Sequence, residues 1–207
     1  MSDEANKTQL EPLKIKCSSS RCASNLHYFR QTKKMRKNNE PPICKECKAD
    51  LVDWPRVRQC DLNDVEHTFL VLKLELIRHS YWHRPFDQKA INYALRKGKV
   101  ELFKAAKSRI KSSVGKPADA FDWSGTSWEG NPICYAQHAT AACCRKCIEK
   151  WHGIPCDQAL TEDQITYLTR LVVLYLEDRL PDLPDNKQKV PSIRRKAAPK
   201  EKKQYGN

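Results

Sequence analysis

The residues with the clearest chemical potential are the cysteines and histidines, because the chain has ten cysteines and six histidines, several of them close together. The densest cluster places three thiols and two imidazoles within residues 138–152. Its members are His138, Cys143, Cys144, Cys147 and His152. Thiolate and imidazole are preferred ligands of zinc, whereas thiols without a role are a liability. The cluster therefore predicts a metal site, the alternative being a helix whose cysteines face a core.

The spacing leaves the choice of ligands partly open. On a helix over 140–151, Cys147 lies four residues from Cys143 and three from Cys144, so either pair can share a face. The preferred ligand set is His138, Cys144, Cys147 and His152, with Cys143 as the alternate ligand. Four protein ligands make a closed, structural site, whereas a free histidine would leave room for chemistry. An iron–sulfur cluster completed by Cys134 or Cys156 is less favoured, because the histidines favour zinc.

A second set of thiols lies near the amino terminus, as Cys17-x4-Cys22 and Cys44-x2-Cys47. Two pairs at this spacing can converge on one tetrahedral zinc, in an arrangement resembling a zinc ribbon. A closed four-cysteine site supports folding and carries no catalysis. Cys60 is left over and is expected to be buried. We therefore expect two zinc sites in this chain.

Evidence for a reaction is weaker. His138 or His152 could act as a base, with Asp122 or Glu129 as a partner for a divalent metal. A helix with this cysteine pattern beside histidines loosely resembles HNH nucleases, but their central asparagine and second histidine have no convincing counterpart. A nucleic-acid hydrolase is therefore the second hypothesis.

His79 and His83 form another pair that could bind a metal, because they lie one helical turn apart. No glutamate follows the first histidine, so the zinc-protease motif is absent. The favoured interpretation is two partly exposed histidines at the end of a helix, where a positive charge suits the helix dipole.

The elements expected to position these residues are mostly helical. Apolar spacing predicts a helix from a cap at Asn63 or Asp64 to about residues 79–83. Further helices are expected over 88–97, capped by Asp87 and ended by Gly98, then over 100–110, 140–151 and 161–180, the last with a Thr161–Gln164 capping box. Residues 112–133 read as a long loop.

These elements predict a mainly α protein in which a small four-cysteine zinc ribbon precedes a compact helical domain with a second His/Cys metal site. The expected divisions are a flexible leader (1–14), the ribbon (15–60), the helical domain (61–183) and a basic disordered tail (184–207).

Charge points to an anionic partner. The chain has 38 Lys and Arg against 25 Asp and Glu, a net charge of +13, of which residues 1–184 retain +7. Cations interleaved with aromatic residues suit phosphate and base contacts, although the same runs could be plain surface. The candidate nucleic-acid residues are Arg30, Lys33, Lys34, Arg36, Lys37, Arg56 and Arg58.

The expected cellular compartment follows from two features that the sequence lacks, a secretory signal and a membrane span. Residues 1–16 have no apolar run typical of a secretory signal, and no segment approaches the roughly 20 apolar residues of a membrane span. We therefore expect no membrane contact and a reducing cytoplasm, in which close cysteine pairs bind metal more often than they form disulfides.

One stretch resembles a known family. Asn131 to Cys147, followed by Glu149–Pro155 and the helix from Thr161, is similar to a bacterial family of domains of unknown function with the core AQHATA, CCR, C and KWHGIP. The resemblance covers roughly residues 85–180, and residues 17–54 look like a zinc ribbon that longer members carry. Cys134 and Cys156 lie outside the family pattern, which weakens the iron–sulfur alternative. The resemblance implies a site but no reaction.

Three functions follow as hypotheses. The first is a zinc-stabilised protein that binds DNA or RNA through a basic surface and tail. The second is a metal-dependent hydrolase acting on nucleic acid. The third is an adaptor whose zinc modules display surfaces to another protein.

Overall fold

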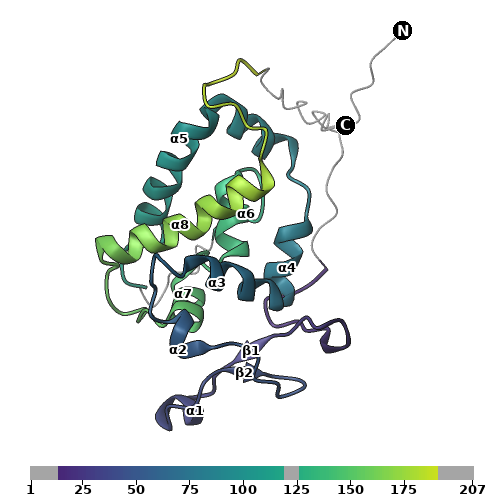
Figure 1. The fold of residues 1–207 in the computed structure, drawn as a ribbon, viewed down its shortest axis with the longest axis vertical. Coiled ribbons are helices and arrows are strands. Elements are labelled where there is room, and N and C mark those ends of the chain that lie inside the picture. The colour runs from purple at the N-terminus through teal and green to yellow at the C-terminus, as the bar shows by residue number, and fades with distance from the viewer. Residues whose placement is uncertain (1–13, 119–125, 191–207) are drawn as a thin grey trace, which may run out of the picture.

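The structure is a computed structural model that describes residues 14–118 and 126–190. The predicted leader up to residue 13, the tail from residue 191 and Asp122 lie outside these ranges. Within them the chain is mainly helical, as the sequence predicts, with one two-stranded sheet (Figure 1). None of the helices in the described part is long and apolar enough to cross a membrane.

The amino-terminal lobe is a short hairpin with small helices around it. Strands β1 (Phe29–Arg30) and β2 (Ile43–Cys44) are antiparallel, with Phe29 opposite Cys44. Between them lies α1 (Lys33–Lys37), which Thr32 caps, and after them comes α2 (Trp54–Val57). The lobe forms the lower end of the molecule in Figure 1, with α1 at its tip.

The first predicted helix is broken into three pieces. They are α3 (Val65–Val71), the 3-10 turn η2 (Leu72–Leu74) and α4 (Leu76–His83). Glu75 is extended (φ −88°, ψ 124°), because the backbone of His27 pairs with its neighbours: His27 donates to the Leu74 carbonyl and Leu76 donates to the His27 carbonyl. Periodicity cannot anticipate this long-range pairing, so the prediction of one continuous helix was wrong.

Helix α5 (Gln88–Val114) starts where it was expected, since Asp87 accepts hydrogen bonds from the backbone of Lys89 and Ala90. It bends at Gly98, whose positive φ of 70° interrupts it as predicted. The expected loop over 112–133 is shorter than predicted at both ends, because α5 continues to Val114 and the next helix begins at residue 132.

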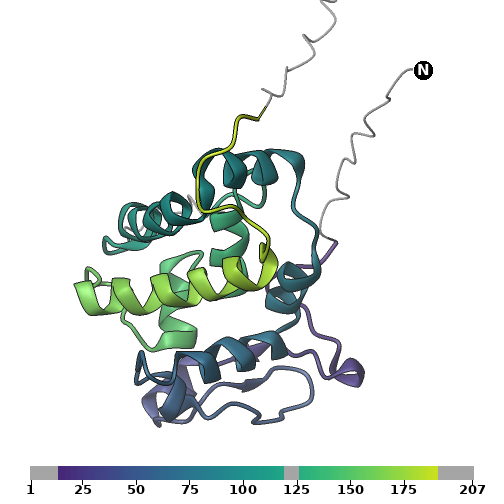
Figure 2. The ribbon, with the colours of Figure 1, turned by 45° about the horizontal axis from the view of Figure 1, so that its top comes forward.

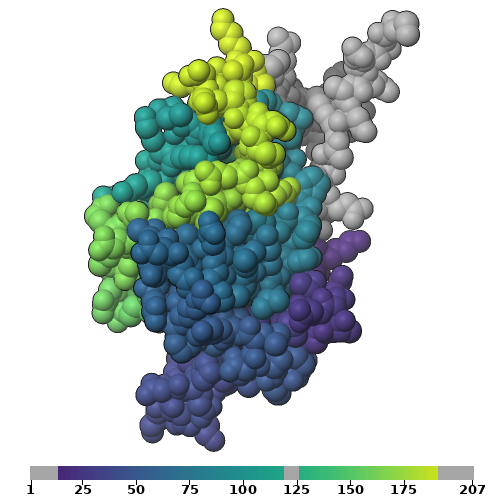
Figure 3. Space-filling view, in the orientation of Figure 1, coloured from purple at the N-terminus to yellow at the C-terminus, as the bar shows by residue number. Residues whose placement is uncertain are grey.

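The core surrounds α6 (Pro132–Ala139), whose eight residues are all buried. Helices α4, α5 and α8 (Glu162–Arg179) pack against it, and α8 in turn contacts α3 and α5 (Figures 1 and 2). Helix α8 begins with the predicted capping box of Thr161 and Gln164. Figure 3 shows α8 crossing one face of the molecule, above the amino-terminal lobe.

The expected helix over 140–151 starts later than predicted. Residues 140–144 form a tight connection in which Ala141 has a positive φ of 57°, and α7 covers only Arg145–His152. Gly153 ends α7 in the left-handed conformation (φ 69°). The two cysteines at positions 143 and 144 therefore precede the helix instead of lying on its faces.

Candidate metal centres

The first group of possible metal ligands consists of Cys22, His27, Cys44 and Cys47, whose ligand atoms all lie within 4.8 Å of one another. Three of them were expected from the sequence. Cys17 was expected as the fourth, but the structure places His27 there instead and leaves Cys17 outside the group. This group could hold a metal ion.

Its geometry suits a single ion. The sulfurs of Cys22 and Cys44 are 3.7 Å apart, and the Cys47 sulfur is 3.4 Å from Nδ1 of His27. On the other side of the imidazole ring, Nε2 is 2.9 Å from Oδ1 of Asn25. Because this oxygen can only accept, Nε2 carries the proton and Nδ1 presents its lone pair to the group, which is the usual way a metal-binding histidine is held.

Tight turns bring the sulfurs together. Asn25 has a left-handed conformation (φ 55°) and donates its backbone hydrogen bond to the Cys22 carbonyl. Lys48, also at positive φ, donates to the Cys44 carbonyl. Burial opposes ionisation of Cys44, but hydrogen bonds from the Cys47 backbone and neighbouring groups outweigh it and lower the pKa of Cys44 to about 6. At neutral pH the Cys44 side chain is therefore readily ionised to the thiolate, which is the form that binds a metal.

The second group consists of Cys143, Cys144 and Cys147, again with all ligand atoms within 4.8 Å. Cys144 is the N-cap of α7, and its carbonyl accepts from the backbone of Cys147, so the two thiols share a tight turn. Thr126 holds the preceding residue, since its hydroxyl donates to the Cys143 carbonyl at 2.8 Å. This group, too, could hold a metal ion.

His138 and His152, the two histidines of the preferred ligand set, do not belong to this group. Nε2 of His138 is 3.0 Å from the Thr126 carbonyl, and Nε2 of His152 is 3.1 Å from the Thr140 carbonyl. The predicted arrangement of two cysteines with two histidines is therefore not the one the structure forms. Both rings instead direct Nε2 at backbone carbonyls, and residues 140–144 form a connection in place of the helix that was expected to align the ligands.

Both histidines are core residues. Burial, with the nearby charge of Arg78, lowers the pKa of His138 to about 4, and burial lowers that of His152 to about 4. The His138 ring is stacked between Tyr81 and Trp128, at centroid distances of 4.7 and 4.5 Å. Neither ring is accessible enough to serve as the base that the hydrolase hypothesis requires.

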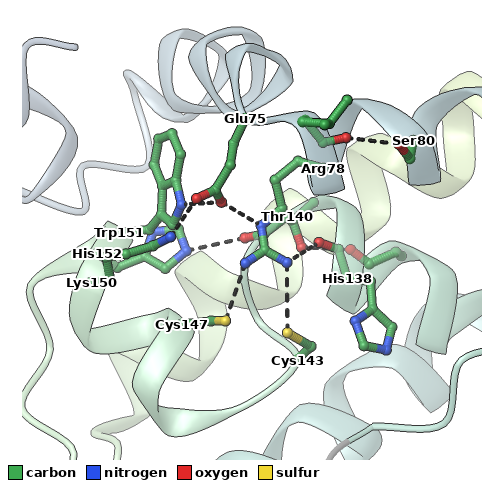
Figure 4. A network of polar contacts seen from close by, with 12 residues as sticks. Glu75, Arg78, Ser80, His138, Thr140, Cys143, Cys147, Lys150, Trp151 and His152 are labelled. Carbon is green, nitrogen blue, oxygen red and sulfur yellow. Dashed lines mark hydrogen bonds and ion pairs between the residues drawn. The ribbon is translucent and has the colours of Figure 1, made fainter. Parts of the chain in front are cut away.

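Arg78 is the residue that organises the second group (Figure 4). Its side chain is 1% exposed and donates to Cys147 at 3.1 Å, with Cys143 at 3.7 Å and the His138 carbonyl at 2.6 Å. Hydrogen bonds from Cys143 and Cys144, together with the charge of Arg78, lower the pKa of Cys147 well below its usual value. The structure thus places a buried cation beside a half-buried thiol whose pKa is lowered.

Glu75 connects the two groups. Its carboxylate accepts from Arg78 at 3.0 Å and from the Trp151 indole at 2.8 Å, and it also contacts the Lys150 ammonium. Its backbone forms a bridge with that of His27, a member of the first group. The groups are therefore held in a fixed relation through one buried, fully bonded carboxylate.

The remaining sequence candidates are dispersed. Glu129 is 59% exposed at its side chain and lies 3.8 Å from Arg84. The rings of His79 and His83 are 4.2 Å apart, yet within residues 14–118 and 126–190 they belong to no group of three possible ligands. The Cys60 thiol, half-buried, donates to the His152 carbonyl at 3.4 Å.

The predicted nucleic-acid residues separate into two sets. An exposed set surrounds the tip of the amino-terminal lobe: Arg30, Lys33, Lys34, Arg36 and Lys37. Arg36 lies 3.5 Å from Glu149. Arg56 and Arg58 are engaged within the protein, since Arg56 forms a two-point ion pair with Asp64 and Arg58 lies over the Trp54 ring.

Three features escaped the sequence reasoning. His27 was not predicted as a ligand. It lies five residues after Cys22, and Cys17 lies five residues before Cys22, so spacing alone could not distinguish His27 from Cys17 as the fourth ligand. Arg78 gave no signal, because a buried arginine cannot be distinguished from a surface one in a sequence. Helix α5 has eight Lys and Arg against one acid, Glu101, which a charge count over 88–114 would have found.

A comparison with protein families supports the suspected kind of family. The family model described as a domain of unknown function (DUF4186) matches residues 66–177. The match begins earlier than the expected residue 85, includes the second group and leaves the first group outside. No solved structure matches the chain.

Proposed function

The chain belongs to the DUF4186 family of domains of unknown function, and we propose that it is a zinc-stabilised protein that binds DNA or RNA through the basic tip of its amino-terminal lobe. The observation that carries this proposal is the exposed row of cations on α1. Its sequence is Lys-Lys-Met-Arg-Lys, without an acid, and it lies at the far end of the molecule (Figures 1 and 3).

The α1 lysines are available to phosphates. Lys33, Lys34 and Lys37 are exposed, and no ion pair with an acid involves them in the part of the chain that the structure describes. Three lysines of α5, in contrast, are partly neutralised: Lys104 pairs with Glu101, while Lys107 and Lys111 pair with Glu162. Free cations contribute more to phosphate binding, because they release condensed counterions without first breaking an ion pair.

Zinc is the metal that the ligand sets favour. Zinc–sulfur bonds of about 2.3 Å in a tetrahedron separate neighbouring sulfurs by about 3.8 Å. The 3.7 Å between the Cys22 and Cys44 sulfurs fits this value. An iron–sulfur cluster would hold its cysteines around several metal atoms and spread them further apart. When bound, zinc would fix the turns that carry α1 and so orient its cations.

The hydrolase hypothesis is less favoured. A divalent ion acting on phosphate is typically held by carboxylates, and neither metal group contains one. The buried histidines with lowered pKa values are not positioned to reach a substrate. The adaptor hypothesis has no surface feature in the described residues that favours it over nucleic-acid binding.

The test is a binding measurement on the full chain. Fluorescence anisotropy with a labelled 20-base-pair duplex and a labelled 20-nucleotide RNA would be followed between 50 and 300 mM salt. Changing Lys33, Lys34 and Lys37 to Gln should weaken binding and reduce the slope of log K against log salt by about three, or about one per phosphate contact.

The matched control replaces three lysines of α5 that already have acidic partners. Lys104, Lys107 and Lys111 changed to Gln remove the same charge from the chain. A smaller loss in this control supports the assignment to α1. Equal losses in both variants would show that net charge alone is responsible, and absence of binding at 50 mM salt would rule out the proposed function.

A further inference from the structure

We propose that Cys17 is the fourth ligand of the second group, so that Cys17, Cys143, Cys144 and Cys147 form one closed four-thiolate zinc site. The site would join the segment at residue 17 to the first turn of α7, where Cys147 lies 130 residues further along the chain. The proposal does not depend on nucleic-acid binding, because it concerns only which side chains complete a metal site.

The path of the chain brings Cys17 to this position. Residues 14–20 run beside α4, the helix that carries Arg78, in both ribbon views (Figures 1 and 2). Ile15 packs against the core, and a turn closed by hydrogen bonds between Lys16 and Ser19 carries the cysteine. Further along the chain, the backbone of His27 pairs with the backbone around Glu75, which anchors the chain that follows residues 14–20 next to the start of α4.

The thiol interacts electrostatically with residues around the second group. Although Cys17 lies in an exposed turn, partial desolvation by neighbouring atoms raises its pKa, the charge of Arg78 opposes this, and the charges of Cys147 and Glu75 add to it. Cys17 also acts on Tyr81, as Cys143 does. These are the residues around the second group, so Cys17 belongs to its surroundings. The Cys17 sulfur is not yet within 4.8 Å of all three thiols, but its exposed turn leaves it room to close on a metal.

The other possible ligands are committed elsewhere. His27 takes the position in the first group that Cys17 was expected to fill. His138 and His152 direct Nε2 at backbone carbonyls, and Cys60 donates to another carbonyl. Of the described thiols outside both groups, Cys17 is the one that interacts electrostatically with both Arg78 and Cys147.

Charge supports a four-thiolate site here. Zinc with four thiolates carries a net charge of about −2. Arg78 donates directly to two of the sulfurs, and the Lys150 ammonium contacts the same Glu75 carboxylate that Arg78 pairs with. Two cations beside this group would offset the negative charge, although Glu75 partly balances them.

The test uses the full chain loaded with two equivalents of cadmium-113, whose NMR resonance moves downfield as thiolates replace nitrogen or oxygen ligands. We expect two resonances, one from three sulfurs and a nitrogen and one further downfield from four sulfurs. Cys17→Ser should shift the downfield resonance upfield and leave the other unchanged. Cys17→His should restore tight binding at the same site with a resonance typical of three sulfurs and a nitrogen.

Two controls make the outcome decisive. Cys60→Ser, which removes a half-buried thiol outside both groups, should leave both resonances in place. His27→Ala should shift only the resonance that Cys17→Ser leaves unchanged. The proposal is overturned if Cys17→Ser alters neither resonance, if it alters the one that His27→Ala alters, or if the chain binds only one cadmium ion. Circular dichroism of each variant verifies that the fold is retained.

Discussion

At the scale of single residues, Arg78 connects several parts of the fold through one buried side chain. It is fully buried and its guanidinium reaches a carboxylate, a backbone carbonyl and two thiols. Burying a cation is costly, and it is tolerated when each donor finds a partner. Arg78 lies on α4, and its partners come from Glu75 just before that helix, from the end of α6 and from the second group, so one side chain joins three parts of the fold.

Replacing Arg78 by Met should therefore destabilise the protein strongly. We expect the free energy of unfolding to fall by about 3–5 kcal/mol, because Glu75 and the thiolates lose their buried partner. The measurement is chemical denaturation of the metal-loaded protein. Arg30→Met, at an exposed position, is the control and should change stability by less than about 0.5 kcal/mol. Similar losses in both variants would contradict the role given to Arg78.

His152 makes stability depend on pH. Its folded pKa of about 4 lies below the ordinary 6.5, so its contribution is present above pH 6.5 and is lost as pH falls towards 4. Between pH 7.5 and 4.5 the wild type should lose about 2–3 kcal/mol through this residue. Denaturation of the wild type and of His152→Gln at both pH values measures the difference, which should shrink at pH 4.5. A difference that stays constant with pH would refute this prediction.

At the scale of elements, the bend of α5 depends on Gly98. Its backbone (φ 70°, ψ 166°) is one that only glycine adopts readily. A Cβ there would lie 2.6 Å from the backbone carbon of Asn186 and the carbonyl oxygen of Asp185. Two backbone hydrogen bonds join the same segments: Lys99 donates to the Pro184 carbonyl, and Gln188 donates to the Leu95 carbonyl. The bend is thus where the chain after α8 packs against α5.

Gly98→Ala and Gly130→Ala separate backbone strain from steric clash. Gly130 also has a positive φ of 86°, but nothing lies within 4 Å of the Cβ it would gain. Gly130→Ala should cost about 1–2 kcal/mol, and Gly98→Ala should cost more by about 1–3 kcal/mol or release residues 184–190. Denaturation and the rate of proteolysis after Lys187 measure both effects. Equal costs and unchanged cleavage would mean that the close contact has no energetic consequence.

At the scale of the whole molecule, the amino-terminal lobe and the helices share one core. Phe29 of β1 and Trp54 of α2 both contact Trp151 of α7, with ring centroids 5.8 and 5.1 Å apart. The sheet has only two residues in each strand, so the lobe has little core of its own and depends on this contact and on any metal that the first group would hold. The division into domains at residue 60 stays a prediction.

Removing metal should therefore affect the whole protein. We expect a chelator to lower the midpoint of thermal unfolding, with tryptophan fluorescence and helical circular dichroism still changing together, because Trp54 and Trp151 join the lobe to the helices. Adding zinc back should restore the midpoint, and adding magnesium should not. A fluorescence change that precedes the loss of helix by several degrees would show that the lobe unfolds on its own.

The sequence by itself determined the local features. Helix class, the caps at Asp87 and Thr161, the break at Gly98 and the two regions rich in thiols all follow from short-range chemistry. A cap or a tight turn depends on residues a few positions apart, which a sequence displays directly.

Only the tertiary structure decided which ligands meet. It replaced Cys17 by His27 in the first group, turned His138 and His152 to backbone carbonyls and buried Arg78 beside the sulfurs. These outcomes depend on contacts between segments far apart in sequence, such as the pairing of His27 with the backbone around residue 75. Spacing limits which residues can share a metal, and the packing of distant segments selects among them.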